Sequence, residues 1–189
     1  RPMRRVTVPL SSMGARFTEL NGDGLPLTVE GASLRALRYE LPVSSAQIKS
    51  ALLLAGLVGQ VEVSVREPRG RSRDHTERLL RALGHRVSEQ ENGWVHLAPG
   101  GTVEPFDLEV PGDPSSAAFL VGAAVLAQGG ELKITSVGVN PTRTGFLEVL
   151  RRMGARIDQE DRPERFGDVR RLRADERIDR GILDRIYTV

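Results

Sequence analysis

Polar groups that could bind an anion gather at the start of an apolar segment, Leu41–Leu57. Ser44, Ser45, Gln47 and Lys49 lie at the beginning of a run that is otherwise aliphatic. If this run is a helix, its first backbone amides and its dipole favour a phosphate or carboxylate, and hydroxyl, amide and ammonium groups would add donors. The alternative is capping, because Ser44 and Gln47 have the S-x-x-Q spacing of a capping box. Capping needs only one serine and one partner, so the residues alone leave both interpretations open.

A second group of possible anion ligands lies in the basic stretch Arg69–Arg73. It holds three arginines, and Ser72 within it is expected to cap a helix that follows. The planar guanidinium can grip a phosphate or carboxylate in two places, so one arginine could share an anion with the first helix. A solvated basic loop is the alternative. His75, just beyond, is expected to be a surface or capping residue.

Two further helix starts carry similar residues. Asp113-Pro114 and Asn140-Pro141 each predict an N-cap followed by proline at the first helical position. Arg143 follows the second of these starts, where simple capping is the favoured interpretation. The pair Ser115-Ser116 repeats the serines of the first segment without its glutamine and lysine, and we therefore expect it to be structural.

Composition excludes several other kinds of site. The 189 residues include 27 basic and 25 acidic ones, a net charge of +2, which gives no global case for binding nucleic acid or a membrane surface. With no cysteine and three scattered histidines, we expect no disulfide, no metal site and no cofactor. No apolar run reaches the ~18 residues of a membrane span, and no signal segment opens the chain. We therefore expect a soluble, cytoplasmic protein.

The elements that must position these residues form a repeat. The strings Met13-Gly14-Ala15-Arg16, Leu83-Gly84-His85-Arg86 and Met153-Gly154-Ala155-Arg156 are 70 residues apart. Ser44-Ser45-Ala46 recurs 71 residues later as Ser115-Ser116-Ala117, and each serine pair precedes a helix-length apolar run and then an alternating strand. We expect each period to hold four strands and two helices in a βαβαββ-like order.

Hydrophobic periodicity and turn residues place the elements of one period. A helix is expected to begin at Arg1-Pro2, and others to span Ala46–Val58 and Arg73–Leu83, the last ending at Gly84 as a left-handed cap. The helix at Ala46–Val58 is apolar all round, which predicts burial on every side with only its start open to a ligand. The expected strands are Ala15–Glu19, Leu25–Glu30, Leu37–Leu41, Val61–Val65, His85–Glu89 and Trp94–Leu97.

Five strings in this order resemble the 5-enolpyruvylshikimate-3-phosphate (EPSP) synthase family. They are RPM, SSAQIKSALLLAGL, SRDHTERLLRALG, VPGDPSSAAF and NPTRTGFLEVLRRMGA, and they cover Arg1 to about Asp158, whereas the tail at 161–189 matches poorly. The resemblance implies an α/β (α+β) fold of repeated βαβαββ units around buried parallel helices, the inside-out barrel of enolpyruvyl transferases. The chain would be an incomplete version of it, a piece of a longer protein.

The resemblance also implies a domain division. Residues 1–108 would be two partial-to-complete units of one globular domain. Residues 109–189 would be the first unit of the second domain plus the tail, with a hinge near Val110-Pro111-Gly112.

The family transfers the enolpyruvyl group of phosphoenolpyruvate to the 5-hydroxyl of shikimate 3-phosphate and releases phosphate, within aromatic amino acid biosynthesis. By resemblance, Ser45, Ala46, Gln47 and Arg73 would bind shikimate 3-phosphate, and Gln47 would touch both substrates. Arg1 would hold phosphoenolpyruvate. The family's proton-transfer groups have no counterpart here, so we expect no catalytic residue in this chain and an inactive isolated chain. The longer protein is expected to be a monomer that binds only its small-molecule substrates.

Two alternatives remain. The related UDP-N-acetylglucosamine enolpyruvyl transferases are disfavoured by the Arg-Asp-His-Thr-Glu and Ser-Ala-Gln-x-Lys strings. A non-catalytic binding module built from repeats is the alternative for the isolated chain.

Overall fold

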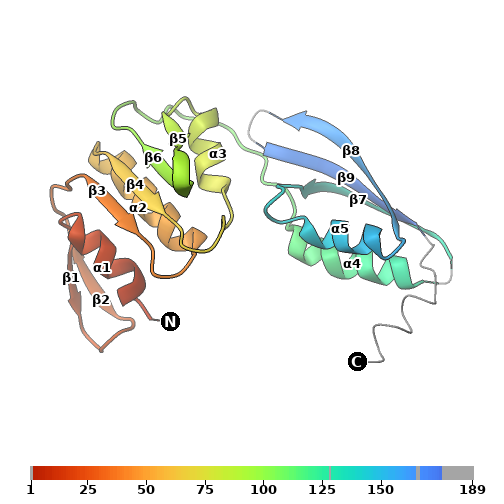
Figure 1. The fold of residues 1–189 in the computed structure, drawn as a ribbon, viewed down its shortest axis with the longest axis horizontal. Helices are drawn as coiled ribbons and strands as arrows, with labels where there is room; N and C mark the ends of the chain where they lie inside the picture. The colour runs from red at the N-terminus through yellow and green to blue at the C-terminus, as the bar shows by residue number, and fades with distance from the viewer. Residues whose placement is uncertain (1, 128, 165–166, 176–189) are drawn as a thin grey trace. The chain divides into compact units, whose positions relative to one another are not determined.

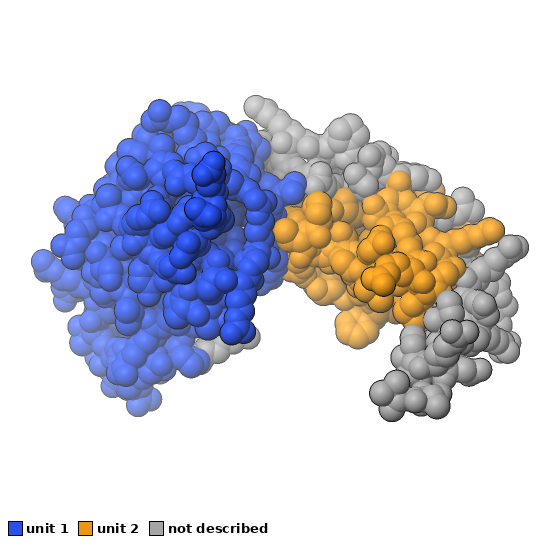
Figure 2. All heavy atoms as spheres, in the orientation of Figure 1, with its two compact units in different colours: residues 1–105 blue, residues 106–189 orange. Residues whose placement is uncertain are grey.

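The structure, a computed structural model, describes residues 2–127, 129–164 and 167–175. The chain divides into two compact units, Arg1–Pro105 and Phe106–Val189 (Figure 2). The boundary expected from the sequence, after residue 108, lies close to this division. The assignment of the units to two domains of a longer protein stays a prediction.

The first unit contains one complete βαβαββ unit, preceded by a helix and a hairpin (Figure 1). Strand β3 pairs in parallel with β4, and β6 pairs antiparallel with both β4 and β5, which gives the strand order β3-β4-β6-β5. Strands β1 and β2 form a separate antiparallel pair. The elements are α1 (Arg4–Ser12), β1 (Arg16–Glu19), β2 (Leu27–Glu30), β3 (Leu37–Glu40), α2 (Ala46–Gly59), β4 (Val63–Arg66), α3 (His75–Ala82), β5 (Val87–Glu89), the 3-10 turn η1 (Glu91–Gly93) and β6 (Trp94–Leu97).

The second unit repeats this order without a full first strand. Its antiparallel sheet has the order β7-β9-β8, and α4 and α5 lie along one face of it in Figure 1. Gly112 forms an isolated parallel bridge to Val137, at the place in the order where a first strand would stand. The elements are α4 (Pro114–Leu126), β7 (Glu131–Gly138), α5 (Gly145–Arg152), β8 (Arg156–Glu164) and β9 (Gly167–Asp175).

Helices α1, α3 and α5 all end in the same turn. Gly14, Gly84 and Gly154 follow them with positive φ angles of 110°, 88° and 95°, which glycine adopts without a steric penalty. The amide after each glycine donates to the carbonyl five residues earlier, as in a Schellman motif. These bonds join Ala15 to Leu10 (3.1 Å), His85 to Leu80 (2.9 Å) and Ala155 to Leu150 (3.0 Å). The predicted 70-residue period is therefore confirmed.

Helix α2 packs closely on strand β4. A Cβ atom added at Gly56 would lie 2.5 Å from Val63 Cγ2, so only glycine allows this approach. Leu52 and Leu53 are fully buried in the core of this unit. However, Leu54 is 46% exposed and Val58 82% exposed. The burial expected on every side of α2 is not found, because in this chain the four-stranded sheet covers only part of the helix.

Among the residues that the structure describes, no helix combines the length and the apolar character that a membrane crossing requires.

Candidate anion-binding site

Helix α2 begins one residue later than the capping-box prediction requires. Its N-cap is Ser45, whose Oγ accepts a hydrogen bond of 3.5 Å from the Ile48 amide. Ser44 lies outside the helix, where its hydroxyl donates to the Arg69 carbonyl (3.1 Å) and accepts from the Arg69 amide (3.2 Å). The predicted box between Ser44 and Gln47 is therefore wrong, since Ile48 and not Gln47 occupies the third helical position.

Gln47 is exposed on the first turn of α2 and is held by an arginine of another helix. Arg5, on α1, donates from Nη2 to Gln47 Oε1 at 2.7 Å. This arginine was missed in the sequence because 42 residues separate it from its partner and no local pattern links them. It adds a positive charge at a helix start that has no acidic residue in its first turn.

The first two amides of α2 have no partner in the described part of the chain. Neither the Ala46 nor the Gln47 amide donates a hydrogen bond there, as expected for the first turn of a helix. With the Ser45 hydroxyl they form a set of donors at the positive end of the helix dipole. Such a set suits a phosphate or a carboxylate.

The three arginines of the stretch after β4 have different surroundings. The Arg71 guanidinium pairs with Glu89, and Arg69 is held through its backbone by Ser44. Arg73 is exposed, and its guanidinium forms no hydrogen bond or ion pair with any described residue. Arg73 is therefore the member of this stretch that is available to an added anion.

Ser72 does not cap α3. The N-cap is Asp74, because the Ser72 amide instead donates to Glu67 Oε2 at 3.0 Å, which holds Ser72 back from the helix. His75 opens the helix and is exposed.

The segment that carries Arg73 is attached to α2 on both sides of that residue. Ser44 holds Arg69 before it, and the hydroxyls of Ser50 and Thr76 share a hydrogen bond of 2.7 Å after it. The structure thus links the two predicted parts of the site, the start of α2 with Ser45, Ala46 and Gln47, and the segment with Arg73. Arg1, the remaining predicted residue, lies outside the described residues.

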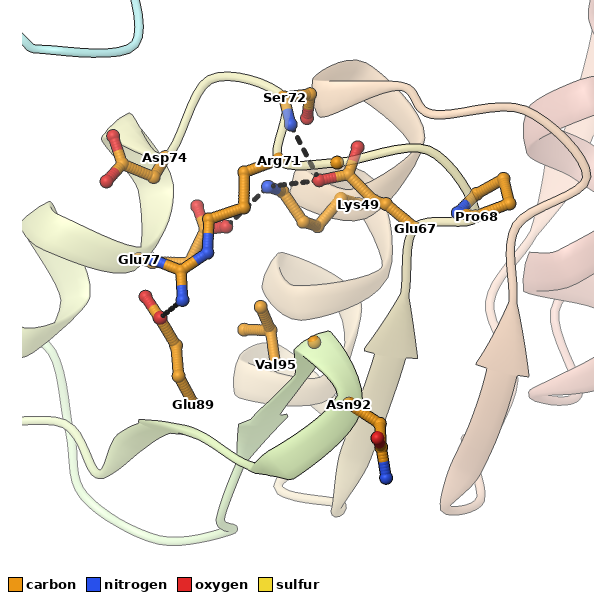
Figure 3. Close-up of a pocket in the computed structure, with 12 residues that line it drawn as sticks. Lys49, Glu67, Pro68, Arg71, Ser72, Asp74, Glu77, Glu89, Asn92 and Val95 are labelled. Atoms are coloured by element: carbon orange, nitrogen blue, oxygen red, sulfur yellow. Dashed lines mark hydrogen bonds and ion pairs between the residues drawn. The ribbon is translucent and has the colours of Figure 1, made fainter.

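Lys49 does not face this site. Its ammonium is buried and lies 2.9 Å from Glu67 Oε2 and 2.7 Å from Glu77 Oε1 (Figure 3). Burial alone would lower the pKa of Lys49, but its hydrogen bonds to Glu77 and Glu67 and their negative charges outweigh burial and raise that pKa. Of the two interpretations that the sequence leaves open for Lys49, the one that makes it a donor to an anion is not supported, since two carboxylates already pair with it.

A cavity of about 370 Å³ lies beside these three residues (Figure 3). None of the predicted binding residues lines it. Four carboxylates and two basic side chains do, so its charge would repel an anionic substrate. The charged residues of the lining are Lys49, Glu67, Arg71, Asp74, Glu77 and Glu89.

Of the two helix starts in the second unit, that of α4 is capped by a side chain, whereas Thr144, the N-cap of α5, makes no side-chain capping hydrogen bond. Asp113 caps α4, accepting from the Ser115 amide at 3.1 Å, and Arg143 donates to Asp113 at 3.0 Å. The predicted N-cap at Asp113 is confirmed. The predicted N-cap at Asn140 is wrong, because its Oδ1 accepts from the Thr142 amide in a tight turn and α5 begins only at Gly145.

No cluster of three or more acidic or histidine side chains within the described ranges has the arrangement of a metal site.

Comparisons with known proteins find relatives over most of this chain. The family model described as EPSP synthase (3-phosphoshikimate 1-carboxyvinyltransferase) matches residues 1–178. The 3-phosphoshikimate 1-carboxyvinyltransferase of Bacillus subtilis is 48% identical over 159 residues, which are 84% of this chain and 37% of that protein. The enzyme of the same name from Pelobacter propionicus is 50% identical over 165 residues, 87% of this chain and 38% of that protein.

Solved structures agree with the sequence relatives. EPSP synthase from Acinetobacter baumannii superposes with a TM-score of 0.81 at 39% identity, over 93% of this chain and 40% of that one. The enolpyruvyl transferase NikO from Streptomyces tendae, at 19% identity and a TM-score of 0.66, shows the fold alone. The chain thus spans about two fifths of the length of these relatives, and the predicted fold class is confirmed.

Proposed function

The chain belongs to the EPSP synthase family, and from this premise we propose that it is part of a 3-phosphoshikimate 1-carboxyvinyltransferase. The whole protein would move the enolpyruvyl group of phosphoenolpyruvate to the 5-hydroxyl of shikimate 3-phosphate and release phosphate. Its substrates would be these two small anions.

The observation that carries this proposal is the set of donors at the start of α2. Its Ala46 and Gln47 amides have no partner among the described residues, and its cap is a neutral serine. The Arg73 guanidinium likewise forms no hydrogen bond or ion pair within the described part of the chain. A phosphate monoester offers the oxygens and the negative charge that such donors accept. We assign the Ser45 hydroxyl and the two amides to the 3-phosphate.

The remaining predicted residues receive supporting roles in the same proposal. Arg73 would grip the phosphate of shikimate 3-phosphate from the neighbouring segment. Gln47, held at Oε1 by Arg5, would turn its Nε2 donor toward the substrate. Arg1 would hold phosphoenolpyruvate.

These residues can bind and orient, which favours reaction by positioning the two substrates. None of them matches the proton-transfer groups of the family. We therefore propose that those groups lie in the part of the protein beyond this chain.

Titration of the 189-residue chain with shikimate 3-phosphate in a calorimeter tests the proposal. Arg73→Ala should weaken binding by about 10- to 100-fold, as expected for loss of a hydrogen bond to a charged group. Arg71→Ala is the matched control, because it removes the same charge from the same segment but from an arginine already paired with Glu89. Equal effects of the two substitutions, or no binding by a folded chain, would refute the assignment.

A further inference from the structure

Three charged side chains form a buried ionic cluster in the first unit: Lys49 on α2, Glu67 directly after β4 and Glu77 on α3. Their side chains are 2%, 7% and 1% exposed. One ammonium lies between two carboxylates, 2.9 Å from Glu67 and 2.7 Å from Glu77. The cluster therefore carries a net negative charge in the interior (Figure 3).

Stability alone does not account for such a cluster. Withdrawing three charges from water costs free energy that their attraction only partly returns, and apolar residues of similar volume often do as well or better. Glu67 Oε1 and Glu77 Oε2 are also buried without a protein hydrogen bond in the described region, which adds to the cost. Unlike apolar packing, the cluster holds each carboxylate in a fixed orientation.

The direction of the Glu67 carboxylate fixes the segment that carries Arg73. The same Oε2 atom that accepts from Lys49 also accepts from the Ser72 amide at 3.0 Å. Glu77, the other partner of Lys49, follows Thr76, whose hydroxyl is bonded to Ser50 of α2. Arg73 thus lies between two points that are both tied to the first turns of α2.

The placement of Lys49 on α2 connects these ties to the proposed phosphate site. It follows Ser45, the N-cap, by one helical turn, so the helix that would bind the phosphate also carries the anchor of the cluster. Arg73 has no hydrogen bond or ion pair with another described residue to hold it. Its position relative to α2 therefore depends on its backbone neighbours.

We propose that Lys49 is a positioning residue, which holds Glu67 and Glu77 so that the segment after β4 presents Arg73 to the anion bound at the start of α2. The proposal rests on the proposed function for the identity of that anion. Lys49 acts through Glu67 and Ser72 and does not touch the substrate.

The test uses a variant in which all three charges are removed at nearly constant volume, Lys49→Met/Glu67→Gln/Glu77→Gln. This neutral-cluster variant leaves no buried charge unpaired, so it should fold where Lys49→Met alone could fail. Far-ultraviolet circular dichroism and a cooperative urea transition verify folding of every variant.

A double-mutant cycle with shikimate 3-phosphate separates positioning from general support of the structure. We expect the neutral-cluster variant to bind about tenfold more weakly than the wild type, within the range for residues of one network. In the Arg73→Ala background the same three substitutions should change the affinity less than about twofold. Equal losses in both backgrounds would overturn the proposal, because a cluster that only supports the fold would act independently of Arg73.

A second measurement needs no substrate. Hydrogen exchange of the Ser72 amide should become about fivefold faster in the neutral-cluster variant, because its acceptor is no longer charged or held. The His85 amide, bonded to Leu80 at the far end of α3, is the internal reference and should not change. Unchanged exchange at Ser72 would overturn the proposal. If the wild-type chain does not bind shikimate 3-phosphate, the proposed function fails, and this exchange result still decides whether Lys49 holds the segment.

Discussion

Helices α2 and α4 begin in similar sequence but with different caps. Both helices are apolar, and both begin beside a Ser-Ser-Ala string. The cap of α4 is a carboxylate, Asp113, which itself accepts from the first turn and is neutralised by Arg143. The cap of α2 is a neutral serine with a long hydrogen bond of 3.5 Å, and no acidic residue follows in its first turn.

The difference shows that a repeated string does not have a repeated role. The serines of α4 lie inside the helix, after Asp113 and Pro114, whereas Ser45 is itself the cap of α2. One helix start is capped by a carboxylate of its own chain, and the other leaves its Ala46 and Gln47 amides without a partner among the described residues.

The largest effect is expected at the buried lysine that only α2 possesses. Lys49→Met should lower the free energy of unfolding by about 3–5 kcal/mol, because it leaves two buried carboxylates without a counter-charge. Lys133→Met, at an exposed lysine of β7 in the second unit, is the control and should change stability by less than about 0.5 kcal/mol. Urea denaturation measures both. If both substitutions lowered the free energy of unfolding by similarly small amounts, Lys49, Glu67 and Glu77 would not form a buried cluster of charged groups in solution.

The two helices should respond oppositely to the same change at a glycine. Gly56→Ala should destabilise the chain by about 1–3 kcal/mol, because the new methyl group would overlap Val63. Gly122→Ala on α4 meets nothing within 4 Å, so it should stabilise by roughly 0.5–1 kcal/mol through helix propensity. Thermal denaturation measures both. A neutral or stabilising Gly56→Ala would contradict the close contact of α2 with β4.

Substitution of the two N-cap residues should affect stability and binding differently. Asp113→Ala should cost about 1 kcal/mol of stability, as for other N-cap replacements, and should leave affinity for shikimate 3-phosphate unchanged. Ser45→Ala should cost only about 0.5 kcal/mol, because its hydrogen bond is long, but should weaken binding measurably. Denaturation and calorimetry on the same samples give both quantities. An equal loss of affinity in Asp113→Ala and Ser45→Ala would contradict the prediction that only the start of α2 binds shikimate 3-phosphate.

The smallest effect is a pH dependence that originates in the first unit. Burial acts to raise the pKa of Glu67, but hydrogen bonds from Ser72 and Lys49 outweigh it and lower that pKa below 4.5. The stability from Glu67 is therefore present above pH 4.5 and lost as the pH falls through its lowered pKa. For Lys49, whose pKa is raised, the contribution is present below pH 10.5 and lost as the pH rises through the raised value.

The neutral-cluster variant is the control for that pH dependence. Urea denaturation as a function of pH should give a flatter curve for the variant than for the wild type at both ends of the range. Curves of identical shape would show that the cluster does not titrate as described.

Features set by local sequence could be predicted well. The glycines that end α1, α3 and α5 recur at one spacing, and the alternation of strand and helix follows directly from hydrophobic periodicity. The resemblance to the EPSP synthase family was carried by five ordered strings and is confirmed by the family match. Each of these helices is followed by a residue with a positive φ angle, which glycine adopts easily. The glycines in the sequence therefore predict where the helices end.

Features set by distant partners could not be predicted. The sequence placed Lys49 beside an anion site, because Glu67 and Glu77, 18 and 28 residues further along the chain, are brought to it only by the packing of β4 and α3 on α2. The capping register of α2 differs from the prediction by one residue, since Ser44 and Gln47 have the spacing of a capping box, whereas the structure uses Ser45 as the cap, with no glutamine at the third helical position. The bond between Arg5 and Gln47 depends on the packing of α1 against α2, for which no motif exists.

The most direct test of the central claim follows the backbone amides of both helix starts by nuclear magnetic resonance during a titration with shikimate 3-phosphate. We predict saturable shifts of the Ala46 and Gln47 amides, smaller or absent with shikimate that lacks the phosphate, and no shift at Ser115 or Ser116. Equal shifts at the two helix starts, or shifts of Ala46 and Gln47 that do not need the phosphate, would contradict it.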